Sequence, residues 1–372
     1  MSTTTRAALT VFCATALTAT LAASPTQAAN DDYVALGDSF SAGTGTRASV
    51  DDCYRSPYGY PALLAGGQGL TLDYQACSGA TTADVHASQL GTLSPQTAYV
   101  TMTIGGNDIG FADVITECAL PGWLSSCGRH IDQARSIMHH QLPQRLDALY
   151  GEIRDRAPSA HVVVAGYPYL FMGKDCNLAT FFSRSEQAEL NQGTAELDGL
   201  ISDRVAEIGF TYVDVRDEFL GHAVCDDPEW INGLSWPIVE SYHPNREGNV
   251  GYADALAPAL TGQGARGPAM QTLGMEPLSA AGTGAGALGA APGTDAAAED
   301  AGMSLREQAD AVLAMGLDTP ANLRKADLHG VDRGKVTRAV AKLRSKNLSV
   351  VERGLVELHA LDDELEARRA GV

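Results

Sequence analysis

The sequence predicts an α/β fold in which helices cover both faces of a parallel sheet, followed by a small C-terminal helical segment. Two observations support this prediction. Short runs rich in β-branched residues are apolar almost throughout, as strands buried on both faces require. Along residues 29–262 these runs alternate with longer segments of helical periodicity. Strand alternating with helix is typical of parallel sheets with crossover helices.

Five strands are expected, at residues 32–36, 70–74, 98–104, 161–165 and 210–215. Helical patterns lie between and after them, at residues 130–157, 185–208 and 251–260. Ser183 or Ser185 is placed to cap the second of these helices, because serine side chains accept hydrogen bonds from first-turn amides.

Residues 1–28 have the features of a signal peptide. Arg6 supplies a positive charge, and residues 7–23 form a short run of apolar and small residues. Thr26 and Ala28 are small residues at the two positions that a signal peptidase recognises before the cleavage site. The apolar run contains threonines and is short for a membrane-spanning helix. We therefore expect cleavage after Ala28 and a secreted, extracellular protein.

The cysteines agree with an oxidising compartment. Cys13 lies in the expected signal peptide, which leaves an even number in the mature chain. An even cysteine count in a secreted chain indicates disulfides. Closeness in sequence favours the pairs Cys53–Cys77, Cys118–Cys127 and Cys176–Cys225. No Cys-x-x-Cys pair occurs, so we expect no metal site.

The composition changes after the α/β region. Residues 263–300 are rich in alanine and glycine and poor in large apolar side chains, which predicts a flexible linker. Residues 301–372 predict a small helical module of unknown role. Its helices are expected at residues 304–315, 320–328, 333–346 and 349–369.

Charge excludes one class of partner for most of the chain. The formal net charge is −19, and such an acidic surface repels phosphate backbones, so we expect no nucleic acid on the α/β domain, residues 29–262. The exception is residues 324–346, with eight basic and two acidic residues. This stretch is either a solvated helix face or a weak attachment site for an anionic surface.

Polar and small residues follow the expected strands where parallel strands bring their carboxyl ends together. They are Gly37-Asp38-Ser39, Cys77-Ser78-Gly79 and Gly105-Gly106-Asn107-Asp108, and a histidine followed by proline comes late in the domain. Acyl transfer needs a nucleophile, a base and donors for an oxyanion. Ser39 and His243 can be nucleophile and base. The backbone N–H groups of Ser39 and Gly79 and the side chain of Asn107 can form the oxyanion hole.

These four blocks, in this order, resemble those of the GDSL/SGNH hydrolase family. The resemblance covers residues 31–260 and is closest to the secreted actinomycete branch of lipases, phospholipases and esterases. It implies a flavodoxin-like three-layer α/β/α sandwich with three disulfides. It also implies the roles just given to Ser39, Gly79, Asn107 and His243. It does not extend to residues 263–372.

The chain departs from the family pattern beside the histidine. Most members have an aspartate three residues before it, and this sequence has Glu240. A glutamate is one methylene longer and can still orient an imidazole. Some relatives use a main-chain carbonyl of the same turn instead. We therefore count Glu240 among the candidate catalytic residues and leave both arrangements open.

The sequence thus predicts a secreted, monomeric serine hydrolase that works through an acyl-enzyme without a cofactor. Its substrate is expected to be a small-molecule or lipid ester, above all a fatty-acyl ester. A phospholipase A activity and a carbohydrate acetyl esterase are the alternatives, and a binding module without turnover is disfavoured. Trp230, Trp236 and Tyr242 near the histidine are either core residues or the wall of an acyl groove.

Overall fold

A five-stranded parallel sheet forms the centre of residues 32–261, the expected catalytic part of the chain. The computed structural model describes residues 32–261 and 302–371. The strand order is β2-β1-β3-β4-β5, which is the flavodoxin-like order. The strands are β1 (Asp32–Gly37), β2 (Thr71–Tyr74), β3 (Tyr99–Thr103), β4 (His161–Ala165) and β5 (Thr211–Val213). All five expected strands are confirmed to within two residues at each end.

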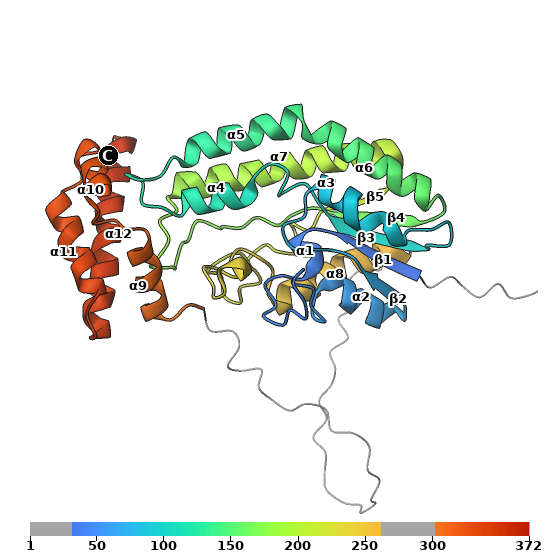
Figure 1. The fold of residues 1–372 in the computed structure, drawn as a ribbon, viewed down its shortest axis with the longest axis horizontal. Helices are drawn as coiled ribbons and strands as arrows, with labels where there is room; N and C mark the ends of the chain where they lie inside the picture. Colours follow the sequence, from blue (N-terminus) through green and yellow to red (C-terminus); the bar gives the residue numbers. More distant parts are fainter. Residues whose placement is uncertain (1–31, 262–301, 372) are drawn as a thin grey trace, which may run out of the picture. The chain divides into compact units, whose positions relative to one another are not determined.

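Helices cover both faces of this sheet (Figure 1). Helices α2 (Tyr60–Gln68) and α8 (Arg246–Thr261) lie side by side on one face, and α6 (Leu142–Arg156) and α7 (Arg184–Ile208) lie on the other. Helices α4 (Phe111–Cys118) and α5 (Cys127–His140) extend the second layer beside α7. The three-layer sandwich is therefore confirmed. Shorter elements connect the layers: α1 (Ser39–Ala42), α3 (Thr82–Asp84), η1 (Val85–Gln89), η2 (Leu90–Thr92) and η3 (Ile238–Glu240).

The prediction of one helix over residues 130–157 is wrong, and the N-cap of α7 is Ser183 rather than Ser185. The single helix expected over residues 130–157 is two helices, α5 and α6, which separate at Gln141. Pro143 sits in the first turn of α6, where its missing N–H is harmless, whereas in the middle of a longer helix it would remove a hydrogen bond and clash. Ser183 caps α7, since its side chain accepts the Glu186 N–H and Glu186 bonds back to the Ser183 N–H.

The register of the sheet aligns the strand ends that precede the site. Gly37 at the end of β1 lies beside Thr103 at the end of β3, and Ala35 lies beside Tyr74 at the end of β2. Loops leaving β1, β2 and β3 therefore meet at one edge. The three disulfides have the expected pairing, Cys53–Cys77, Cys118–Cys127 and Cys176–Cys225. The first of them ties the loop after β2 to the chain that follows α1.

The C-terminal segment folds into the four helices expected for it. They are α9 (Leu305–Ala314), α10 (Pro320–Leu328), α11 (Arg333–Leu343) and α12 (Leu348–Ala370). Their apolar faces form a second core, which also takes in Trp123, Ala179 and Phe181 from two loops of the catalytic part. The Gly122 N–H donates to Asp362 on α12 at 2.7 Å. The second core is thus built from both parts of the chain.

The expected signal peptide, residues 1–28, and the expected linker, residues 263–300, lie outside the described residues. Among the helices of residues 32–261 and 302–371, none combines the length and apolar character that a bilayer crossing needs.

Candidate active site

Ser39 stands at the start of α1, two residues after the end of the interior strand β1. Asp38 is the N-cap, and its carboxylate accepts the Phe40 N–H at 3.1 Å. Gly37 makes the sharp exit from the strand possible, with φ of 113°. A Cβ at that position would lie 2.3 Å from the Thr103 carbonyl oxygen, so only glycine fits against β3. The nucleophile's position is fixed by backbone geometry.

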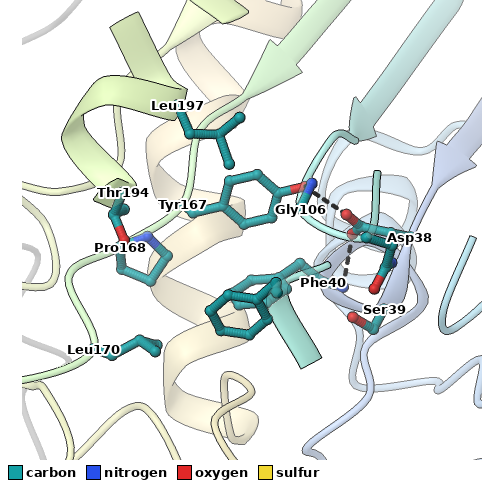
Figure 2. Close-up of a pocket in the computed structure, with 11 residues that line it drawn as sticks. Asp38, Ser39, Phe40, Gly106, Tyr167, Pro168, Leu170, Thr194 and Leu197 are labelled. Atoms are coloured by element: carbon teal, nitrogen blue, oxygen red, sulfur yellow. Dashed lines mark hydrogen bonds between the residues drawn. The ribbon is translucent and has the colours of Figure 1, made fainter. Parts of the chain in front are cut away.

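Asp38 anchors this turn to the neighbouring strands. Its carboxylate accepts a hydrogen bond from the Thr103 hydroxyl at 2.7 Å and one from the Tyr167 hydroxyl (Figure 2). Burial raises the pKa of Asp38 to about 6, and the hydrogen bonds from Tyr167 and Thr103 oppose that rise. All of these contacts hold the chain in place, so the carboxylate has a structural position one residue away from the nucleophile.

His243 is placed to take the proton of Ser39. Its Nε2 lies 2.7 Å from the Ser39 Oγ, and its Nδ1 lies 2.8 Å from the Ser241 carbonyl oxygen. A carbonyl can only accept, so Nδ1 carries the hydrogen and Nε2 is left as the acceptor for the hydroxyl proton. Desolvation lowers the pKa of His243 to about 4, against a small rise from the Ser241 carbonyl. The ring is therefore neutral near pH 7.

Glu240, the candidate for orienting this ring, lies elsewhere in the structure. Its side chain is buried, and its carboxylate accepts the backbone N–H of Arg47 at 3.2 Å. The imidazole is bonded instead to the Ser241 carbonyl, the main-chain alternative left open by the sequence. Glu240 thus fastens the loop that contains Arg47, and the structure does not bring its carboxylate to His243.

Asn232 and Gly45, which the sequence did not single out, hold the histidine loop. The Asn232 N–H donates to the His243 carbonyl and its own carbonyl accepts the Tyr242 N–H, both at 2.9 Å. Its side chain donates to the Gly45 carbonyl at 2.8 Å and to the Glu240 carbonyl at 3.2 Å.

We call these hydrogen bonds of Asn232 the histidine-loop clamp. Two residues beside the clamp, Gly45 and Tyr242, have unusual backbone conformations. A Cβ on Gly45, whose φ is 104°, would lie 2.8 Å from the His243 Cβ. Tyr242 adopts a φ of 60°, which is unfavourable for a bulky residue and is maintained here by the surrounding hydrogen bonds. This conformation lies between Ser241 and His243, where the chain turns the Ser241 carbonyl back toward the ring.

The three expected oxyanion donors, the N–H groups of Ser39 and Gly79 and the side chain of Asn107, lie at one edge of the sheet. The Asn107 side chain donates to the Ala80 carbonyl at 3.0 Å, which leaves its second N–H available. Gly79, with φ of 82°, lies one residue before Ala80. Within the described residues, the N–H groups of Ser39 and Gly79 donate to no other protein atom. Backbone donors without an internal acceptor are what a developing oxyanion requires.

The loops that contain these donors are tied to each other. Thr82 donates twice to the Asp108 carboxylate, from its N–H at 2.9 Å and from its hydroxyl at 2.6 Å. Asp108 follows Asn107 directly, and Thr82 lies three residues after Gly79. Because this pair joins the loop after β2 to the loop after β3, the donors from the two loops cannot drift apart independently.

A cavity opens beside Ser39 (Figure 2). Most of its wall is apolar or aromatic, and Ser39 and Asn107 contribute the polar groups nearest the chemistry. The remaining lining residues are Asp38, Phe40, Gly106, Phe111, Tyr167, Pro168, Leu170, Thr194 and Leu197.

The aromatic residues near His243 do not form this wall. Trp236 is 65% exposed, whereas Tyr242 is buried against Phe171 and Phe182. Trp230 stacks on His222 with ring centroids 3.9 Å apart. None of the three lines the cavity beside Ser39, and Tyr242 is a core residue.

The described residues 32–261 and 302–371 contain no group of three or more His, Cys, Asp or Glu side chains arranged to hold a metal ion.

Comparisons with known proteins agree with this geometry. The model of the GDSL-like lipase/acylhydrolase family matches residues 35–250. The chain is 42% identical over 241 residues to Lipase 1 of Streptomyces coelicolor, covering 63% of this chain and 87% of that protein.

Two solved structures are similar at 40% identity. An extracellular lipase from Streptomyces rimosus has a TM-score of 0.58, with 61% of this chain and 99% of that one covered. Phospholipase A1 from Streptomyces albidoflavus NA297 has a TM-score of 0.57, with 62% and 98% covered.

Proposed function

Because the chain belongs to the GDSL-like lipase/acylhydrolase family, we propose that it is a secreted lipase in which Ser39 and His243 cleave fatty-acyl esters. The family and the Streptomyces lipases similar to this chain support carboxylic ester hydrolase activity. The observation that carries the fatty-acyl preference is the apolar cavity that begins at the Ser39 hydroxyl. The extracellular relative and the three disulfides support secretion.

The reaction begins with proton transfer from the Ser39 hydroxyl to Nε2 of His243. The Ser39 Oγ attacks the ester carbonyl carbon, and the carbonyl oxygen becomes an oxyanion. That oxyanion accepts hydrogen bonds from the N–H groups of Ser39 and Gly79 and from the Asn107 side chain. Because these donors are already in position, they need little reorganisation as charge develops.

His243 then gives its proton to the leaving alcohol, and the acyl group stays on Ser39. Water, deprotonated by the same imidazole, attacks the acyl-enzyme and releases the fatty acid. In this mechanism the Ser241 carbonyl holds the ring and stabilises the imidazolium through one hydrogen bond. A carbonyl stabilises a cation less than a carboxylate does, so the protonated ring readily passes its proton to the leaving group.

Phospholipase A activity is the second candidate, supported by the likeness to the phospholipase A1 from Streptomyces albidoflavus. Both activities cleave a fatty-acyl ester and differ in the alcohol part. The carbohydrate acetyl esterase is less well supported, because the wall beside Ser39 is mostly apolar and aromatic and offers few polar groups to a sugar.

The test compares wild type and Ser39→Ala on p-nitrophenyl esters, phosphatidylcholine and acetylated xylan. We expect wild type to prefer fatty-acyl substrates, and we expect Ser39→Ala to lose about three orders of magnitude or more in turnover on all of them. A tenth of wild-type activity in Ser39→Ala would refute the nucleophile. A preference for acetylated xylan would refute the fatty-acyl assignment while leaving the nucleophile in place.

A further inference from the structure

An exposed apolar loop tip lies a few residues before the catalytic histidine. We call residues 235–241 the Trp236 loop; at its tip Trp236 is 65% exposed and Ile238 is 50% exposed. Neither side chain lines the cavity beside Ser39. We infer that the tip is a docking surface for zwitterionic lipid, and that it brings Ser39 to esters packed at a lipid–water interface. This inference rests on the proposed hydrolysis of fatty-acyl esters at Ser39.

The two ends of the Trp236 loop are bonded to each other. The Ser235 N–H donates to the Ser241 Oγ at 2.9 Å, and both residues are buried. Within the loop, the Glu240 N–H donates to the Pro237 carbonyl and the Ser241 N–H donates to the Ile238 carbonyl, both at 3.0 Å. The exposed tip is thus part of a tight, hydrogen-bonded turn whose ends are anchored in the protein.

A second segment is bonded to the Trp236 loop and adds another exposed apolar residue. The Arg47 N–H donates to the Glu240 carboxylate at 3.2 Å, and the Arg47 guanidinium donates to the Ser235 hydroxyl at 3.3 Å. Val50, three residues after Arg47, is 71% exposed. Large apolar side chains that gather on exposed loops, rather than occurring singly, mark an interaction site.

The chemistry of the tip suits the boundary between lipid and water. Trp236 combines a large apolar ring with one N–H group, and such side chains favour the headgroup level of a bilayer. The Ile238 side chain has no polar group to desolvate, Pro237 has no backbone N–H, and no residue from 236 to 239 is charged. Entry of the tip into a lipid surface therefore buries apolar area at a small polar cost.

The Trp236 loop leads directly into the active site. The carbonyl of Ser241, its last residue, lies 2.8 Å from Nδ1 of His243. Ile238 is five residues before His243, which limits the distance between their Cα atoms to about 18 Å, the length of a fully extended chain. A lipid surface that receives the tip is therefore close to His243 and Ser39, and its ester groups have a short path to the nucleophile.

The charge of the protein selects the kind of lipid. The formal net charge is −19, so anionic headgroups repel the chain. Glu240, the acidic residue of the Trp236 loop, is buried and accepts the Arg47 N–H, which leaves the tip itself neutral. Docking through the tip should therefore be strongest on zwitterionic lipid. The basic stretch at residues 324–346 would favour an anionic surface instead, so lipid charge distinguishes the two surfaces.

The first measurement is binding to vesicles of diether phosphatidylcholine, whose ether links an esterase does not cleave. Of the three tryptophans, Trp123 is buried, Trp230 is half-buried and Trp236 is the most exposed. We therefore expect wild-type emission to shift to shorter wavelength on these vesicles and to be quenched when the lipid chains are brominated. Trp236→Ser should lose the shift.

The second measurement compares variants in a vesicle co-sedimentation assay and in two hydrolysis assays. The variants are Trp236→Ser and Ile238→Ser, and the matched control is Leu328→Ser, which removes an 85% exposed side chain at the end of α10. Each loop variant should lower vesicle binding, and hydrolysis of phosphatidylcholine vesicles, by about tenfold. On dissolved p-nitrophenyl acetate both should stay within about twofold of wild type, and Leu328→Ser should resemble wild type in every assay.

The docking surface is overturned if folded Trp236→Ser and Ile238→Ser bind vesicles like wild type, or if Leu328→Ser loses as much binding as they do. Tighter binding of wild type to phosphatidylglycerol than to phosphatidylcholine also overturns it. A dimer that forms without vesicles and is abolished by Trp236→Ser would assign the tip to a second copy of the chain. Failure of the proposed function is distinguishable, because wild type would then bind the diether vesicles and hydrolyse neither ester substrate.

Discussion

The histidine at the site works beside a carbonyl rather than a carboxylate. His243 accepts from Ser39 through Nε2 and is held through Nδ1 by the Ser241 oxygen. A neighbouring carboxylate would raise the pKa of the imidazole, whereas a neutral carbonyl raises it less and leaves burial as the main influence. The consequence is a base that remains unprotonated in mildly acidic solution.

The pH dependence of activity tests this arrangement. Because the pKa of His243 is lowered to about 4, kcat/KM on a soluble ester should stay high down to about pH 5 and fall only below it. The measurement is a profile of kcat/KM from pH 3.5 to 8, with circular dichroism as the check that the protein stays folded. An acid limb at pH 6.5 or above in folded protein would contradict the lowered pKa of His243.

The same shift has a defined effect on stability. The folded-state pKa of His243 lies below its unfolded value of about 6.5, so the folded state binds this proton less tightly. Its contribution to stability is complete above pH 6.5 and is lost as the pH falls toward 4.

Glu240→Gln separates a positioning role in the loop from a role in catalysis. If the Ser241 carbonyl orients His243, kcat should fall by less than about tenfold, whereas loss of a triad acid costs about 10⁴-fold. The melting temperature should fall as well, because the buried carboxylate accepts the Arg47 N–H. A loss of several orders of magnitude in kcat without a change in melting temperature would restore Glu240 to the catalytic group.

At the scale of elements, three strand ends and one long loop each position a different group of the site. The turn after β1 positions Ser39, the loops after β2 and β3 supply the donors, and the long loop before α8 supplies His243. The first three are fixed by the register of the sheet. The fourth has no strand to hold it, and Asn232 replaces strand pairing with hydrogen bonds to both sides of the histidine.

Asn232→Ala tests this clamp. Removing the side-chain bonds to Gly45 and Glu240 should lower kcat by about 10- to 100-fold with little change in KM, because a small displacement of His243 acts on the transition state. The matched control is Asn322→Ala, whose side chain also donates to two backbone carbonyls but lies between α9 and α11. Equal effects of the two variants on kcat would mean that Asn232 contributes general stability only.

The elements that the sequence could and could not predict differ in a physical way. Strands and the nucleophile turn were predictable because continuous apolar runs and Gly-Asp-Ser are local signals. Asn232 and Gly45 were not, since they act through backbone contacts with distant segments. The cavity wall was missed for a related reason: apolar residues such as Phe111 and Leu197 look like ordinary core in a helical pattern.

For the whole molecule, the notable feature is the second core. The four C-terminal helices bury Trp123 and Phe181 of the catalytic part, and Phe181 stacks on His359 of α12 with ring centroids 4.6 Å apart. Composition indicated a helical module, but it contained no sign of what the module would contact. No residue of α9–α12 lines the cavity beside Ser39.

A chain ending at Gly264 tests how far the catalytic part depends on these helices. The sheet core and the cavity at Ser39 contain none of their residues, so kcat on a soluble short-chain ester should stay within about threefold of the full chain. The exposed Trp123 and Phe181 should make the shortened protein self-associate and melt earlier. Light scattering and thermal unfolding measure this, and Phe181→Ser in the shortened chain should reduce the association.

Loss of activity in a folded, monomeric shortened chain would show that the helices contribute to the active domain itself. Unchanged melting temperature and no association would show that the second core is dispensable.

Burial of Trp123 also has a consequence for the order of biosynthesis. The ribosome makes residues 302–371 after Trp123, so the indole of Trp123 lacks these partners until those helices arrive, although it is only 1% exposed in the folded protein. Trp236 is 65% exposed in the folded protein. The fluorescence of Trp123 should therefore shift to shorter wavelength when residues 302–371 dock on the growing chain, and this shift reports when the second core forms.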